Sequence, residues 1–305
     1  MTARGPIAAT RRPRTAAAPE LRRLKLRARR KVDSLFAGDY LSAYKGRGIE
    51  FAEVREYQPG DDVRAIDWNV TARTGRPFIK EFVEERELTV MLALDLSASG
   101  RFGSTDRLKT DLLREAAAVL ATVATDNNDR VGLLTFTDRI ERFIAPSKGT
   151  RHISALLDAA MDSQAAGRGT DLPLALRTLA STIRRRAVMF VISDFLLPSM
   201  RDVERPLGAL GRRHDITAVR LTDPRERDLP PAGLLTVEDP ESGLRLTVDA
   251  SSRRLRRELR EHFDRQGAEF GALCARTGAQ LIDLATDRPL IADLVRGLRA
   301  RGTGR

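Results

Sequence analysis

Three oxygen-bearing side chains follow an apolar run in the first third of the chain. Asp95, Ser97 and Ser99 come directly after Leu88–Leu94, a run typical of a buried β-strand. In extended chain, residues i, i+2 and i+4 point to one side, so these three side chains begin by facing together. Carboxylate and hydroxyl oxygens where a strand meets a loop suit a hard divalent cation. The spacing is compatible with chelation but does not by itself establish it.

Two further oxygen ligands follow the same logic. Asp194 comes after the apolar run Val188–Ile192, and Thr170 lies in a glycine-containing loop just before a helix that we expect to begin at Leu172. Open α/β sheets bind ligands beyond the carboxyl ends of their strands, where such residues gather. Two carboxylates and three hydroxyls favour Mg²⁺ or Mn²⁺ over zinc or copper. If waters complete the octahedron, one of them can be exchanged for a partner's carboxylate. Thr170 and Asp171 could also simply cap the helix.

Alternating strand and helix patterns must position these residues. We expect strands at 88–94, 131–136, 140–144, 188–192, 216–221 and 280–284, and helices at 107–125, 153–161, 172–185, 201–213, 253–276 and 290–301. This order predicts an α/β fold with a doubly wound, mostly parallel sheet. Leu234–Val237 and Leu244–Val248 interrupt it and predict an inserted β-hairpin near 232–249.

The predicted domain organisation has three parts. Residues 1–19 are rich in arginine, alanine and proline and predict a disordered basic tail. Residues 20–86 predict a basic amphipathic helix, ending near Gly38, and then a subdomain of extended chain and turns with an edge strand at 78–85. Residues 87–305 form the α/β domain.

Composition excludes several classes of protein. The single Cys274 rules out an internal disulfide and a cysteine-based zinc site. No apolar run approaches the ~20 residues of a membrane-spanning helix, so we expect a cytoplasmic protein. Of the net charge of +11, residues 1–50 carry +9, with 13 basic against 4 acidic side chains. The body is therefore nearly neutral, and no specific nucleic acid is expected. Whether the basic helix binds lipid, nucleic acid or protein stays open.

The residues Asp95, Ser97, Ser99, Thr170 and Asp194 resemble the metal-ion-dependent adhesion site of von Willebrand factor A domains. The upstream segments more specifically resemble the bacterial domain-of-unknown-function family fifty-eight over roughly residues 40–285; these segments are GIEF (48–51), REY (55–57), GDDVRAIDW (60–68) and TAR (71–73). The resemblance implies a von Willebrand A-like fold, a bound Mg²⁺ or Mn²⁺, and a MoxR-type AAA+ ATPase as partner. Phe195 stands where adhesion receptors usually have glycine, so extracellular adhesion is not inferred.

The upstream block also supplies candidate partner-binding residues, namely Arg55, Asp61, Asp62, Arg64 and Trp68. A structural role is the stronger interpretation, because arginine–carboxylate pairs and aromatic side chains commonly fix a subdomain. We therefore expect the two arginines to pair with the two aspartates, and Trp68 to anchor a core.

Among functions, the enzymatic alternative is a metal-dependent phosphohydrolase with Asp95 as nucleophile. Enzymes of the haloacid-dehalogenase type place a general acid two residues later, where this chain has Ser97, which cannot act as an acid at neutral pH. A second alternative is nucleic-acid or membrane-surface binding through the basic arm. The favoured hypothesis is a non-enzymatic, metal-dependent adaptor. It would act with a MoxR-type ATPase in chaperone-like assembly or maturation of a client that offers a carboxylate.

Overall fold

The computed structural model describes residues 38, 40, 43, 44, 50–83, 87–161, 165–197 and 199–302. The predicted tail, almost all of the predicted basic helix, and the motif residues 46–49 lie outside the described residues. Tyr40 and Tyr44 are buried against the core of the main domain. The Tyr40 hydroxyl donates to Asp129, and the Tyr44 hydroxyl lies 2.6 Å from that of Thr217.

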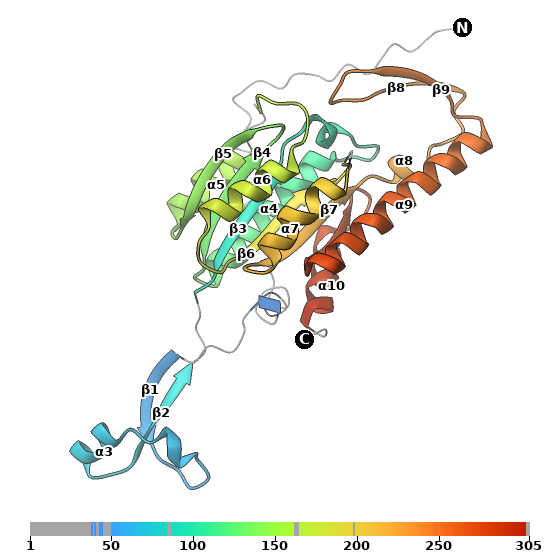
Figure 1. The fold of residues 1–305 in the computed structure, drawn as a ribbon. Helices are drawn as coiled ribbons and strands as arrows, with labels where there is room; N and C mark the ends of the chain where they lie inside the picture. Colours follow the sequence, from blue (N-terminus) through green and yellow to red (C-terminus); the bar gives the residue numbers. More distant parts are fainter. Residues whose placement is uncertain are drawn as a thin grey trace.

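A six-stranded sheet forms the centre of the main domain (Figure 1). Its strands, in the spatial order β10-β7-β6-β3-β4-β5, are Gln280–Ala285, Asp215–Thr222, Val188–Ser193, Thr89–Asp95, Arg130–Phe136 and Ile140–Ser147. All neighbours run parallel except β5, which is antiparallel to β4. The predicted doubly wound, mostly parallel α/β fold is confirmed.

Helices cover both faces of this sheet. They are α4 (Lys109–Asp126), α5 (Thr150–Met161), α6 (Leu172–Thr182), α7 (Arg201–Gly211), α8 (Pro224–Arg227), α9 (Arg253–Thr277) and α10 (Leu290–Gly302). Because side chains alternate along a strand, Leu92 of β3 packs with α4, α5 and α10, whereas Met91 packs with α6, α7 and α9. Two apolar cores, one on each face of the sheet, therefore hold the strands and position the residues at their ends.

Some predicted boundaries were wrong. The helix predicted over 172–185 ends at Thr182, because Ile183 turns to extended backbone and buries its side chain. Strand β5 extends to Ser147, three residues beyond the prediction. The short helix α8 was not predicted, although Asp223 and Glu226 form a capping box around it.

The upstream residues form a small unit that stands apart from the sheet in Figure 1. Strands β1 (Glu50–Glu56) and β2 (Phe78–Val83) pair antiparallel, and between them lie a 3-10 turn, η2 (Val63–Ala65), and a helix, α3 (Trp68–Thr74). The prediction of extended chain and turns missed α3, which Asp67 caps through the backbone N–H groups of Asn69 and Val70. Its seven residues are too few to show an apolar period.

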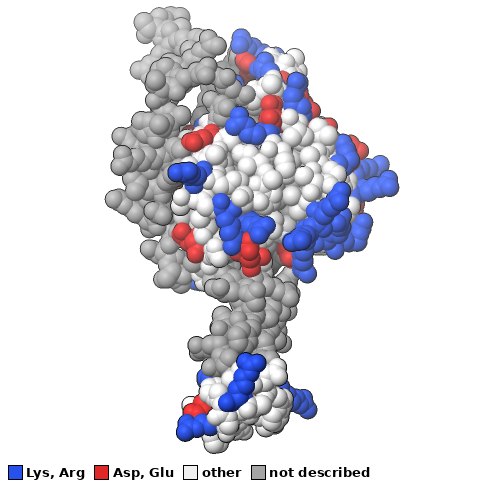
Figure 2. All heavy atoms as spheres, turned by 90° about the vertical axis from the view of Figure 1, so that its left-hand side faces the viewer, with Lys and Arg blue, Asp and Glu red and all other residues white. Residues whose placement is uncertain are grey.

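The inserted hairpin is confirmed. Strands β8 (Leu234–Glu238) and β9 (Arg245–Asp249) pair antiparallel with each other. Among the described residues, no helix is long and apolar enough to cross a membrane. Seen from the side of β5 and α5, the centre of the surface is largely uncharged, and basic side chains gather toward one edge with fewer acidic side chains among them (Figure 2).

Candidate metal centre

The carboxyl ends of two neighbouring parallel strands bring the predicted carboxylates together. Asp95 is the last residue of β3, and Asp194 follows the last residue of β6. These strands pair directly, with Leu94 opposite Ile192. Both aspartates are buried. The neighbouring strand ends place them as the sequence predicted.

Hydrogen bonds fix Asp95 and its two serines. One oxygen of the Asp95 carboxylate accepts from the backbone N–H of Ser97 at 2.9 Å, and the other accepts from the hydroxyl of Ser193 at 2.6 Å. The hydroxyl oxygens of Ser97 and Ser99 lie 3.0 Å apart. A 3-10 turn, η3 (Ala98–Arg101), begins here. The Ser97 hydroxyl interacts with the Asp95 carboxylate, and the Ser99 hydroxyl lies beside that of Ser97.

The loop before α6 brings Thr170 to the same place. The Thr170 hydroxyl lies 3.5 Å from the Asp95 carboxylate. Asp171 caps α6 by accepting from the backbone N–H of Leu174, which confirms the capping role. The loop is also held to its neighbours, because the backbone oxygen of Arg168 accepts from the backbone N–H of Ala98, and the Glu141 carboxylate accepts from the backbone N–H of Gly167. Thr170 thus reaches the site from a braced loop.

Replacement of Gly167 by alanine tests how far this bracing positions Thr170. The added methyl group would collide with the Thr137 hydroxyl and the Asp138 carboxylate, so the loop or these two side chains must shift. Overpacking of this kind costs about 1–3 kcal/mol. We expect lower stability and weaker Mn²⁺ binding in calorimetric titrations. Gly169→Ala is the matched control, because its methyl group meets the Glu241 carboxylate at an ordinary 3.6 Å. Equal Mn²⁺ affinity in the two variants would contradict the bracing.

A buried lysine, which sequence reasoning missed, faces Asp194. The Lys109 ammonium lies 2.7 Å from the Asp194 carboxylate and 2.5 Å from that of Glu226, with only 1% of its side chain exposed. Glu226 is itself held by the Asp223 backbone N–H at the start of α8. The available signal was that Lys109 is one of very few lysines in an arginine-dominated chain.

The buried charges around Lys109 and the predicted metal ligands do not balance. Burial and the nearby Asp194 raise the pKa of Asp95 from 3.8 to about 7. Burial likewise raises the pKa of Glu226. Although burial opposes its charged form, Lys109 has a raised pKa because Asp194 and Glu226 surround it. One ammonium therefore faces several carboxylates, and a divalent cation would supply the missing positive charge.

The donor chemistry fits Mg²⁺ or Mn²⁺. Among the described residues, no group of three or more histidine, cysteine, aspartate or glutamate side chains is placed to hold a metal. The candidate site therefore depends on the hydroxyls of Ser97, Ser99 and Thr170 as well as on Asp95 and Asp194. An oxygen-only set that includes hydroxyls suits hard cations, which commonly keep several waters.

A third carboxylate reaches the site from the inserted hairpin. Thr170 donates its hydroxyl hydrogen bond to Glu241, at 3.1 Å, across 71 positions of sequence. Burial raises the pKa of the Glu241 carboxyl, whereas hydrogen bonds from Thr170 and Ser99 oppose that shift. Sequence reasoning placed the hairpin but not its tip, because nothing in the spacing connects residue 241 with residue 170.

The structure confirms some of the expectations for the upstream candidate residues and contradicts others. Arg55 and Asp61 form a bidentate ion pair, as expected, at 2.8 Å. Asp62 instead accepts from the backbone N–H of Arg64 and caps η2. The expectation that Trp68 anchors a core was wrong, because 70% of its surface is exposed. As the first residue of α3, Trp68 has its side chain mostly in solvent.

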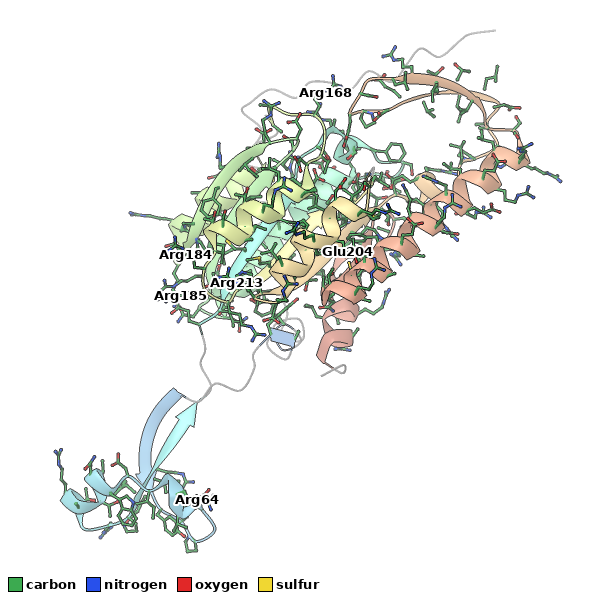
Figure 3. All side chains as sticks on the ribbon, viewed as in Figure 1. Arg64, Arg168, Arg184, Arg185, Glu204 and Arg213 are labelled. Atoms are coloured by element: carbon green, nitrogen blue, oxygen red, sulfur yellow. The ribbon has the colours of Figure 1, made fainter. Side chains whose placement is uncertain are left out.

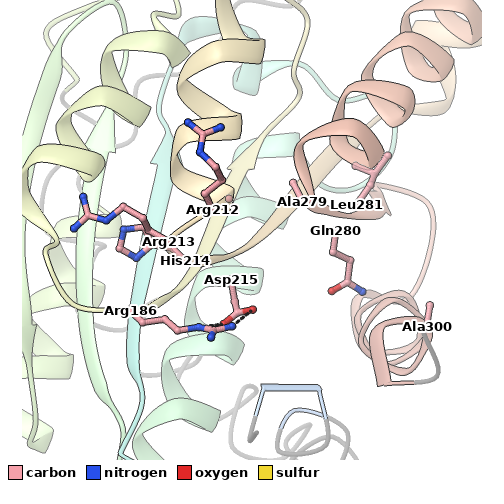
Figure 4. Close-up of a pocket in the computed structure, with 11 residues that line it drawn as sticks. Arg186, Arg212, Arg213, His214, Asp215, Ala279, Gln280, Leu281 and Ala300 are labelled. Atoms are coloured by element: carbon pink, nitrogen blue, oxygen red, sulfur yellow. Dashed lines mark hydrogen bonds and ion pairs between the residues drawn. The ribbon is translucent and has the colours of Figure 1, made fainter. Parts of the chain in front are cut away.

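A hollow lies at the other end of the sheet, where β7 and β10 begin. It encloses about 550 Å³ and is lined by Arg186, Arg213, His214 and Gln280 among others (Figure 4). Arg186 is paired with Asp215 there. Arg184, Arg185 and Arg213 gather at the same end of the domain (Figure 3). None of the predicted site residues lines this hollow.

His214 makes the stability of the fold sensitive to acid. The ring is 4% exposed, and neither of its nitrogens has a partner among the described residues. Burial and Arg213 lower its pKa below 6.5. The fold thus favours the neutral ring. The stability that this preference contributes is complete above pH 6.5 and is lost as the pH falls below it.

We expect His214→Leu to lose less stability between pH 7.5 and pH 5 in urea titrations than the wild type. The control is His262→Leu on an exposed helix face, and equal losses in the wild type and His214→Leu would contradict the assignment.

Comparisons with known proteins identify relatives of this chain. A family model described as "Protein of unknown function DUF58" matches residues 53–269. Uncharacterized protein Rv1480 of Mycobacterium tuberculosis H37Rv is 38% identical over 300 residues, which cover 96% of this chain and 91% of that protein. Uncharacterized protein YeaD of Bacillus subtilis strain 168 is 33% identical over 82 residues, which cover 25% of this chain and 21% of that protein.

Solved structures with a similar arrangement share little sequence with this chain. BatB from Bacteroides thetaiotaomicron is 14% identical with a TM-score of 0.45, over 71% of this chain and 100% of that one. A von Willebrand factor type A protein from Catenulispora acidiphila is 12% identical with a TM-score of 0.40, over 74% and 43%. Because the family model spans more than half of the sequence and the mycobacterial relative nearly all of it, the chain belongs to the DUF58 family.

Proposed function

We propose that this chain is a non-enzymatic protein-interaction module that binds a carboxylate-bearing partner through a Mg²⁺ or Mn²⁺ ion. The observation that carries the proposal is the meeting of Asp95, Ser97, Ser99, Thr170 and Asp194 at one end of the sheet. Two carboxylates and three hydroxyls would hold the ion. When bound, it would supply an electrophilic position open to a partner's oxygen.

Exposed apolar side chains near these ligands support an interaction role. Phe102, which follows η3, is 41% exposed, and Leu196, two residues after Asp194, is 43% exposed. Apolar anchors beside a polar centre are typical of protein-binding surfaces. A phosphohydrolase would instead need a general acid at position 97. Ser97 cannot act as one at neutral pH, and its hydroxyl lies 3.0 Å from that of Ser99.

The partner we propose is a MoxR-type AAA+ ATPase, acting with this chain on a client protein. Support comes from the upstream block, which resembles the DUF58 family; that resemblance implies a MoxR-type ATPase as partner. The exposed Trp68 and the exposed Val63 give the upstream unit an apolar surface of its own. Such side chains are frequent binding anchors, so this unit is a second contact that we assign to the ATPase.

The experiment is a pull-down of a MoxR-type ATPase by the full chain, in Mg²⁺ and in EDTA. We expect Mg²⁺-dependent capture that Asp95→Ala abolishes and that Asp126→Ala, an exposed control at the end of α4, leaves intact. Capture by Asp95→Ala in EDTA at the wild-type level would reject the metal bridge. Trp68→Ala then tests whether the upstream unit carries the contact.

A further inference from the structure

The tip of the β8–β9 hairpin lies against the candidate metal centre. Besides the 3.1 Å hydrogen bond from Thr170 to Glu241, the guanidinium of Arg168 donates to the backbone oxygen of Pro240 at 3.1 Å. Figure 3 shows Arg168 beside the turn that closes the hairpin. The carboxylate of Glu241 is also near enough to Asp194 for the two charges to repel. Glu241 therefore lies beside Thr170 and close to Asp194.

The tip is held in one shape by its own hydrogen bonds. The Asp239 carboxylate accepts from the backbone N–H of Glu241 at 3.0 Å, and the Asp239 backbone oxygen accepts from Gly243 at 2.7 Å. Gly243 has φ +74°, a left-handed conformation that favours glycine. The backbone N–H of Asp239 closes the turn by donating to Leu244. A turn ordered in this way presents Glu241 in a fixed direction.

The strands of the hairpin, in contrast, are weakly held. Leu234 is 75% exposed and Leu246 is 56% exposed, and β8 and β9 pair with each other in a sheet of two strands. The base is anchored, because Ala250 is buried and its backbone N–H donates to Gly233. An arm with an anchored base, exposed strands and an ordered tip can leave the site without unfolding the sheet.

We propose that Glu241, which in this structure accepts from Thr170 and is not grouped with Asp95 and Asp194 around a metal position, is an internal carboxylate ligand that would move onto a bound ion, into the position that a partner's carboxylate would take. This inference rests on the proposed function. With metal bound, the hairpin closes over the site, and a partner gains access only by displacing Glu241. A tethered carboxylate has a high effective concentration, so a weak carboxylate in solution competes poorly and a partner with additional contacts competes well.

The test uses the full chain, Mn²⁺ as the probe, and Glu241→Gln. The variant keeps the size of the side chain and its ability to accept from Thr170, but loses the charge. We expect Mn²⁺ affinity to fall about tenfold or more. Relaxation of solvent water protons should report one more exchangeable water on the Mn²⁺ of the variant. The matched control is Glu238→Gln, which removes an exposed carboxylate paired with Arg245 in the same hairpin.

Hydrogen exchange supplies a second readout. Mg²⁺ should slow amide exchange at residues 239–244 in the wild type and not in Glu241→Gln. If Mn²⁺ binds both proteins with equal affinity and equal water count, the inference is overturned and the proposed metal site stands. If the wild type binds no Mn²⁺, both are overturned.

Discussion

Replacement of Lys109 by methionine is expected to lower the free energy of unfolding by about 3–5 kcal/mol. The methionine side chain is one atom shorter and carries no charge, so the Asp194 and Glu226 carboxylates stay behind without their shared ammonium. Removal of one partner from a buried ion pair is costly because the other charge then has neither solvent nor partner. Urea unfolding of the metal-stripped protein measures the loss.

Two comparisons separate this effect from lost packing. Lys148→Met removes a lysine that pairs with Glu87 but is 36% exposed, and should cost less than about 1 kcal/mol. Adding Glu226→Gln to Lys109→Met should recover part of the loss, because one of the stranded charges is gone. A double variant as unstable as Lys109→Met would mean that packing, and not charge, explains the loss.

The second large effect concerns Asp95 and pH. Burial and the nearby Asp194 raise the pKa of Asp95 to about 7 in the metal-free fold, against 3.8 in an unfolded chain. Because the folded state holds this proton more tightly, the metal-free protein loses stability as the pH rises from about 4 to 7, and the loss is complete above 7. A shift of this size corresponds to roughly 4 kcal/mol at pH 8.

Asp95→Asn should therefore be more stable than the wild type at pH 8 when both are stripped of metal. At pH 4 the two should be nearly equal, and in saturating Mg²⁺ the order should reverse, because only the wild type gains binding energy. Urea titrations at the two pH values measure the difference, with Asp126→Asn as the exposed control. Parallel behaviour of the wild type and Asp95→Asn across pH would show that Asp95 is not a strained, buried charge.

The sequence predicted the strands and the loop that position this site, because these elements follow from local patterns. Apolar runs located the buried strands β3 and β6, and residues that follow neighbouring parallel strands must meet at one edge. The sequence alone therefore indicated that Asp95 and Asp194 lie side by side. Thr170 followed from its place in a glycine-containing loop just before a helix, although the cap of that helix proved to be Asp171.

The unpredicted parts depend on contacts between distant segments. Lys109 meets Asp194 across 85 positions and Glu226 across 117, and no periodicity links them. Glu241 reaches Thr170 only because the hairpin folds back over the domain. Trp68 was misjudged for another reason, since aromatic side chains are usually buried and only the packing around a short helix could show that this one is not.

The most direct test of the account is calorimetric titration of Mn²⁺ into the metal-stripped wild type, Asp95→Ala and Asp126→Ala. We expect one site per chain in the wild type and in Asp126→Ala, and none in Asp95→Ala. Binding to Asp95→Ala with wild-type affinity, or no binding to the wild type, would contradict the assignment of a metal centre at the ends of β3 and β6.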